Sequence, residues 1–217
     1  MFTIFVIVIA VGVFVMYFRG EQQRTRRLRE SGPRPIAELP EDTPGRVAGI
    51  AQPPDEPLIA PFSGRPCVYY AATIERRRPV DPATIAATPL ADDAGWTVVA
   101  SETRSIAFVI QDETGRALIE PTAAKVELDA PVSAPIDGAA LTARQRELLA
   151  QHHVGEAGEP LRYREVTIAV GEAIAVFGSG TREPDPQAVP ADYRGEPATR
   201  LRLTSSAKHP LFISNRR

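Results

Sequence analysis

The sequence predicts a mainly β protein, with a compact antiparallel small barrel or sandwich, one inserted short helix, and a single transmembrane helix at the N-terminus. Three observations lead to this fold class. Short β-branched and aromatic runs alternate with turns along the 217 residues, which include 21 prolines and 15 glycines. Only one later stretch carries helix-capping signals. The first eighteen residues form an uncharged, apolar run.

Residues 1–18 predict a membrane-spanning helix, because eighteen helical residues cover roughly 27 Å and the hydrocarbon core is about 30 Å thick. The alternative is a cleaved signal peptide, which predicts a basic start and a small-residue cleavage site. Here the basic residues follow the run instead, as Arg19, Arg24, Arg26, Arg27 and Arg29. The positive-inside rule then leaves the N-terminus outside and the remaining chain in the cytoplasm, with these arginines beside the lipid headgroups.

Charge and cysteine usage exclude several function classes. Residues 35–217 carry 19 basic and 25 acidic side chains, a net charge of −6, so nucleic-acid binding is not expected. The single cysteine can complete neither an intrachain disulfide nor a cysteine-based zinc site. The three histidines show no ligand spacing, and we expect neither metal nor cofactor. The use of 23 arginines against 2 lysines suggests a bacterial protein, and hence an inner membrane.

Residues 19–44 read as a basic juxtamembrane segment followed by a proline-rich spacer, and residues 45–217 as the folded domain. Within this domain the expected strands are short and mostly sequential, numbering seven to nine. They are residues 46–52, 67–75, 96–99, 106–111, 117–120, 125–128, 161–170, 173–177 and 199–203, and residues 209–214 close the domain. Residues 179–198 read as turn and loop.

Caps and turns mark the remaining elements. Thr142 and Gln145 have the spacing of a capping box, which predicts a helix over residues 142–153. Gly115 is expected to take a positive φ in a hairpin turn, and Gly171 to form a tight turn before the next strand. The Gly178-Ser179-Gly180 stretch lacks the context of a dinucleotide loop and also reads as a turn.

Two groups of residues raise the question of chemistry. Cys67 is a candidate nucleophile, but it begins an apolar strand without a nearby histidine, which favours a core position. The cluster Arg76, Arg77 and Arg78 is a candidate interaction patch for phosphate headgroups or an acidic partner, with a solvated strand end as the alternative.

Several motifs in order resemble the GIDE-type, or "beside a membrane", domain of membrane-anchored mitochondrial and chloroplast E3 ubiquitin ligases and of bacterial membrane proteins. The resemblance covers roughly residues 45–214. The residues that carry it are Pro61, Gly64, Cys67, Trp96, Phe108, Asp112, Gly115, Glu165, Gly171, Gly178 and Ser214. It implies turns at Gly64, Gly115 and Gly171, and core positions for Cys67, Trp96 and Phe108.

The resemblance implies an interaction or sensing module. The related ligases carry a second membrane span and a RING finger. This sequence shows no other long apolar run for a second span, and its single cysteine is too few for the ligands of a RING. We therefore expect a single-pass, non-enzymatic binding or scaffolding module with an unknown protein partner. The alternatives are an accessory member of the ubiquitin ligase family, or a cysteine-dependent enzyme or redox sensor at the membrane.

Overall fold

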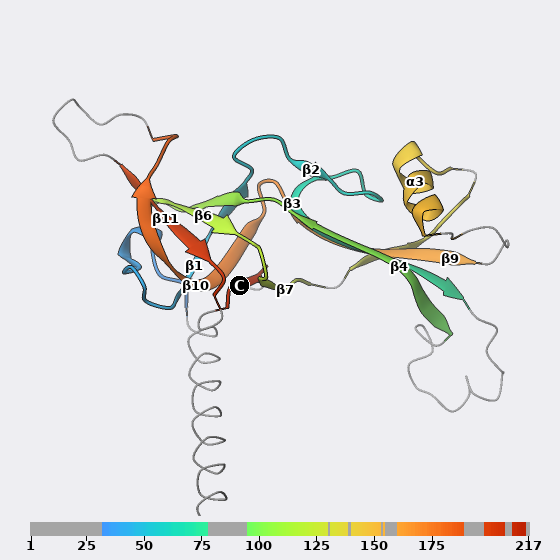
Figure 1. The fold of residues 1–217 in the computed structure, drawn as a ribbon, viewed down its shortest axis with the longest axis horizontal. Helices are drawn as coiled ribbons and strands as arrows, with labels where there is room; N and C mark the ends of the chain where they lie inside the picture. The colour runs from blue at the N-terminus through green and yellow to red at the C-terminus, as the bar shows by residue number, and fades with distance from the viewer. Residues whose placement is uncertain are drawn as a thin grey trace, which may run out of the picture.

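The computed structural model describes residues 32–77, 95–129, 131–138, 140–152, 154, 160–188, 198–206 and 210–215. As predicted, these residues are mainly β, with one α-helix, and they form two sheets that lie side by side (Figure 1). The predicted membrane span, residues 1–18, and the arginines after it lie outside the described residues. No helix in the described ranges is long and apolar enough to cross a bilayer.

The first sheet closes into a five-stranded barrel, because β1 pairs with both β5 and β10. Around the barrel the order is β1-β5-β6-β11-β10, and β12 and β7 extend it beside β10. A five-stranded Greek-key barrel is the architecture of OB-folds. The strands are β1 (Gly45–Gln52), β5 (Phe108–Gln111), β6 (Arg116–Glu120), β7 (Lys125–Glu127), β10 (Ala173–Pro184), β11 (Thr199–Thr204) and β12 (Phe212–Ser214).

Most strand pairings in the described residues are antiparallel, as expected, but two in this sheet are parallel, β6 with β11 and β7 with β12. The turn expected at Gly178 and Gly180 is wrong, because both lie inside β10. A Cβ atom on Gly180 would stand 1.9 Å from the carbonyl oxygen of Arg202, and one on Gly178 would stand 2.6 Å from Leu211 Cδ1. Glycine is needed there for close packing rather than for a turn.

The barrel core extends further toward the N-terminus than the sequence indicated. Ile36, in the short 3-10 helix η1 (Ile36–Glu38), and Leu39 are both buried in the main hydrophobic cluster. The Arg182 guanidinium donates to the carbonyl oxygens of Ile36, Ala37 and Leu39. Residues 34–44 therefore pack as part of the domain, although their prolines suggested a spacer.

The second sheet has the order β2-β3-β9-β8. The strand β4 also pairs with β3, on the edge of β3 that faces away from β9, over residues 69–77 of β3. In the pairing of β3 with β4 the register shifts between Ile74 and Glu75, because Val99 of β4 has no partner on β3. The helix α3 lies against one face of this sheet (Figure 1). The elements are β2 (Leu58–Ile59), β3 (Pro66–Arg77), β4 (Trp96–Ser105), β8 (Val132–Pro135), β9 (Leu161–Ala169) and α3 (Ala143–Gln151).

The predicted helix signals are confirmed at the start of α3. The Thr142 side chain accepts from the Gln145 backbone, and the Gln145 side chain accepts from the Thr142 backbone, which completes a capping box. Leu148 and Leu149 of this helix pack against Ile74 and Ala100. Ile74 and Glu75 pair with consecutive residues of β9, so the side chains of β3 alternate regularly there and Glu75 faces away from the helix.

The backbone angles confirm two of the predicted glycine turns, and the positive φ expected at Gly115 is wrong. Gly64 and Gly171 have φ of 67° and 85°, values that favour glycine, as expected for turns. Gly115 is not among the residues with positive φ. Its turn is held instead by Asp112, whose Oδ1 accepts from the backbone N–H groups of Thr114 and Gly115.

Candidate functional site

The predicted arginine patch does not exist as a single surface. β3 runs through Arg76 and Arg77 rather than ending before them, and Arg78 lies outside the described residues. Because side chains alternate along a strand, Arg76 and Arg77 point to opposite faces of the sheet. The prediction that adjacent arginines act together is therefore wrong for these two.

Cross-strand pairing assembles a different cluster on the face opposite α3. Arg77 pairs with Trp96 of β4, and Glu75 pairs with Arg162 of β9. The Glu75 carboxylate lies 2.5 Å from Arg162 Nε and 3.8 Å from Arg164 Nη1. The Arg162 guanidinium also stacks over the Trp96 ring, 4.3 Å from its centroid. We call Glu75, Arg77, Trp96, Arg162 and Arg164 the arginine–tryptophan face.

The arginine–tryptophan face has a net positive charge, although the domain as a whole is acidic. It holds three arginines and one buried carboxylate, Glu75, which lies close to Arg162 and Arg164, and Arg77 is exposed. Trp96 is only partly buried, so the core position implied for it by the family resemblance is wrong. The Arg162 guanidinium covers one face of its ring.

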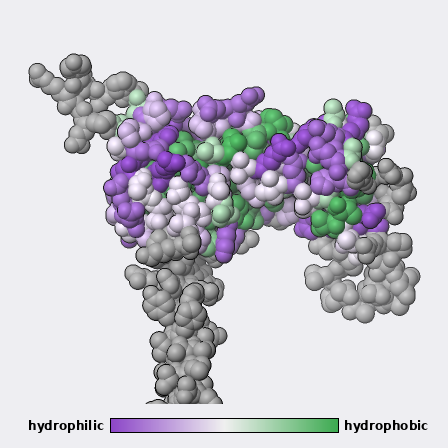
Figure 2. Space-filling view, viewed as in Figure 1, coloured by the Kyte–Doolittle hydropathy of each residue, from purple (hydrophilic) through white to green (hydrophobic). Residues whose placement is uncertain are grey.

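β4 borders this face and forms an edge of the sheet. Among the described residues its ten-residue backbone pairs with β3 alone. Val98 on this strand is 55% exposed, and Val132 on β8, at the other edge, is 60% exposed. Apolar surface gathers around the second sheet and its junction with the barrel, whereas the visible barrel surface is more hydrophilic (Figure 2). An unpaired strand edge is a template for adding another strand.

Cys67 has the properties of a core residue. Its side chain is fully buried in a cluster with Ala60, Tyr70 and Ala72. Burial, and then the charge of Glu165, raise the pKa of the Cys67 thiol to about 11. A thiol with such a pKa carries little thiolate near neutral pH, which makes it a poor nucleophile.

Glu165 holds the loop that follows β2. Its side chain is 3% exposed, its Oε2 accepts from the backbone N–H of Phe62 at 2.9 Å, and its Oε1 accepts from that of Ser63 at 3.1 Å. The Phe62 ring stacks on Tyr163, with the centroids 4.4 Å apart. Pro61 and Gly64 belong to the same loop, so these motif residues have a shared structural role.

The remaining motif residues lie in the barrel and do not meet at one site. Phe108 is fully buried, as the resemblance implied. Asp112 fixes the β5–β6 turn and also accepts from the Ile36 backbone N–H at 2.8 Å. Ser214 pairs with Ala175 of β10 and Glu127 of β7. Within the described ranges, no group of three or more His, Cys, Asp or Glu side chains is arranged to hold a metal ion.

The structure therefore defines a small β module, built from a closed barrel and a helix-covered sheet with a positively charged outer face. The profile of the GIDE domain, described as E3 Ubiquitin ligase, matches residues 90–216. This is more than half of the chain, which therefore belongs to the GIDE family, as its motifs predicted. Neither the curated proteins nor the solved structures contain a significant match.

Proposed function

We propose that the protein is a single-pass, membrane-anchored and non-enzymatic binding module, and that it docks an extended acidic segment of a partner protein along β4. The observation that carries this proposal is the placement of the arginine–tryptophan face beside the β4 edge. Backbone pairing would supply affinity, and the charged face would select acidic side chains in the added strand.

The chemistry of the arginine–tryptophan face suits protein recognition. Tryptophan and arginine are enriched among the residues that dominate binding energy at interfaces. Trp96 and Arg162 already stack on one another, so binding costs little additional side-chain entropy. Glu75 fixes Arg162, while the exposed Arg77 extends the positive charge toward the strand end.

The proposed anchor is residues 1–18, with the N-terminus outside a bacterial inner membrane and the domain in the cytoplasm. The apolar length and the arginines that follow it support this orientation. A reporter fused to the C-terminus should be active in the cytoplasm and should fractionate with membranes. Deleting residues 2–18 should move the protein to the soluble fraction, and a reporter active only outside the cytoplasm would overturn the orientation.

The alternatives receive less support. A cysteine-dependent enzyme or redox sensor needs an accessible thiolate, whereas Cys67 is buried with a raised pKa. A role as an accessory protein in a ubiquitin-like pathway rests on family membership alone, and fold or family does not fix function. The single cysteine offers no set of RING ligands within this sequence.

Two matched valine variants test the docking surface by cross-linking and affinity capture of the full chain from native membranes. Val98→Asp places a negative charge beside the proposed acidic segment, and should lower capture of the cross-linked partner by about tenfold or more. Val132→Asp makes the same change at the opposite edge of the sheet and should leave capture unchanged.

The captured segment, identified by cross-link mapping, should be acidic and should join to β4. Equal capture by the two variants, or cross-links that map away from β4, would overturn the proposal. Binding of phosphatidylglycerol vesicles with the same dependence on Val98 would assign this face to the lipid surface instead of a protein.

A further inference from the structure

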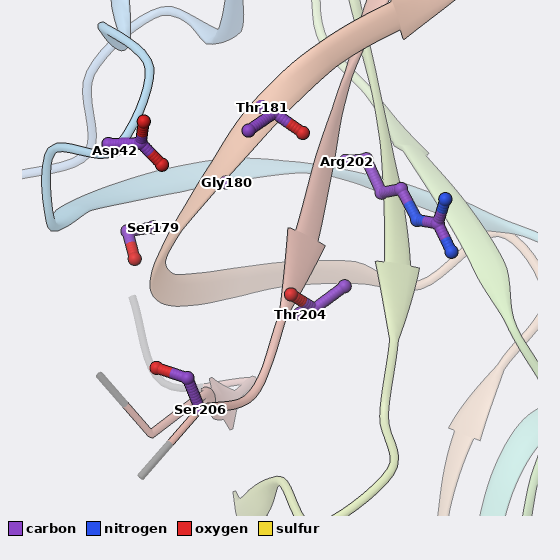
Figure 3. Close-up of a pocket in the computed structure, with 7 residues that line it drawn as sticks. All are labelled: Asp42, Ser179, Gly180, Thr181, Arg202, Thr204 and Ser206. Carbon is purple, nitrogen blue, oxygen red and sulfur yellow. The ribbon is translucent and has the colours of Figure 1, made fainter. Parts of the chain in front are cut away.

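A groove of about 540 Å³ lies on the barrel, separate from the arginine–tryptophan face (Figure 3). Volumes of roughly 300–1,000 Å³ are usual for small-molecule sites. The groove runs between the β10–β11 pair and the turn that precedes β1. The residues that line it are Asp42, Ser179, Gly180, Thr181, Arg202, Thr204 and Ser206.

The wall of the groove consists of small hydroxyl side chains on the outside of the barrel. Ser179 pairs with Thr204, and Thr181 pairs with Arg202, so their side chains share one face. Leu203, between the two β11 residues, points into the core and is fully buried. Gly180 pairs with Leu203, and a Cβ atom there would collide with the Arg202 backbone, so glycine lets β10 and β11 approach closely behind this wall.

The opposite rim is formed by Asp42, whose backbone is fixed. Asp42 has a φ of 55°, a left-handed conformation that aspartate adopts more readily than most residues. Its N–H donates to the Gly180 carbonyl oxygen at 2.8 Å. The neighbouring Glu41 carboxylate accepts from the Arg182 backbone N–H, and Arg182 in turn holds residues 36–39. The Asp42 carboxylate is thus presented by a well-braced turn.

The polar groups around the groove suit a neutral ligand rich in hydroxyl groups. In the described part of the chain, the Asp42 carboxylate and the hydroxyls of Ser179, Thr181 and Thr204 make no hydrogen bond or ion pair with protein groups. Arg202 is paired with Glu120 and Glu183, and its side chain extends away from Asp42, Ser179 and Ser206 (Figure 3). The carboxylate left facing the groove disfavours anions, since like charges repel.

We infer that this groove binds a neutral hexose unit. One carboxylate can accept hydrogen bonds from two neighbouring sugar hydroxyls, while serine and threonine hydroxyls can both donate and accept. The same hexose chemistry occurs in a soluble glycan and in a glycolipid headgroup. This site is independent of the docking surface on β4, so either proposal can fail alone.

The test uses the full chain in nanodiscs of phosphatidylcholine and saturation-transfer NMR with maltotriose and the methyl glycosides of glucose, galactose and mannose. At least one sugar should show transfer. Asp42→Gly removes the carboxylate but keeps a residue that tolerates positive φ, and it should weaken binding of that sugar about tenfold. Thr204→Val removes one hydroxyl at nearly constant volume and should weaken binding several-fold.

The matched control is Asp55→Gly, the same substitution at an exposed loop position away from the groove, and it should bind sugar as the wild type does. Absence of transfer to every sugar tested would overturn the inference, as would equal binding by Asp42→Gly and Asp55→Gly. Monoglucosyl diacylglycerol added to the nanodisc separates the two sources: reduced transfer to the soluble sugar identifies the lipid headgroup as the ligand, and unchanged transfer identifies the soluble glycan.

Discussion

Replacing Glu165 with glutamine should destabilise the domain strongly, although the two side chains have nearly the same shape. The carboxylate accepts one backbone N–H on each oxygen, from Phe62 at 2.9 Å and Ser63 at 3.1 Å. An amide retains one acceptor, and its NH₂ group would face the other N–H. Losing one bond in a buried site costs about 1–3 kcal/mol, and converting the second from a charged to a neutral acceptor costs about 1 kcal/mol. We therefore expect a loss of roughly 2–4 kcal/mol, a large share of the 5–15 kcal/mol typical of a domain.

Urea unfolding of the full chain in detergent, followed by the fluorescence of the single tryptophan, Trp96, measures this loss. Glu147→Gln is the matched control, because Glu147 is exposed and its pair with Arg144 spans one helical turn. Such a surface pair contributes about 0.5 kcal/mol or less. The reasoning is refuted if Glu165→Gln unfolds within about 0.5 kcal/mol of the control, a margin set by ordinary surface substitutions.

Two further predictions concern ionisable groups. At about pH 8, a thiol reagent should label Cys67 at least roughly 100-fold more slowly in the native protein than in denaturant, because burial and Glu165 raise its pKa to about 11; comparable rates would show that the thiol is accessible. Burial acts to raise the pKa of Asp112, but hydrogen bonds from Ile36, Thr114 and Gly115 outweigh it and lower the pKa. The stability contributed by this carboxylate is therefore present above the unfolded pKa of about 3.9 and is lost as the pH falls through the lower folded pKa. Asp112→Asn should cost about 1–2 kcal/mol in urea unfolding at neutral pH, and this difference should shrink in acid; a difference independent of pH would contradict the assignment.

Local signals in the sequence predicted local structure well. The capping box at Thr142 and Gln145 depends on groups three residues apart, and the structure contains both of its hydrogen bonds. The turns at Gly64 and Gly171 follow in the same way from one residue that tolerates positive φ. The apolar character around Cys67 and Phe108 correctly predicted their burial, because the hydrophobic effect requires only that such side chains leave water.

Predictions failed where a distant segment decides the role of a residue. Gly178 lies within β10 rather than in a turn, and glycine is needed there because Leu211, more than thirty residues later in the chain, packs where a Cβ atom would be. Ile36 and Leu39 are buried because the barrel and Arg182 hold a segment whose prolines alone indicated a spacer. Gly115 needs no positive φ, because Asp112 satisfies the backbone N–H groups of its turn.

The sequence by itself determined the class of the domain, its one capped helix, its family, and the uncharged run that predicts an anchor, since each depends on composition or on short-range pattern. Only the tertiary structure decided which residues share a surface. It separated Arg76 from Arg77, brought Arg162 to Trp96 and Arg164 to Glu75, and placed Asp42 and Ser179 around one groove. The physical reason is strand register: side chains alternate between two faces, so the neighbours of a residue depend on the alignment of strands that lie far apart in the chain.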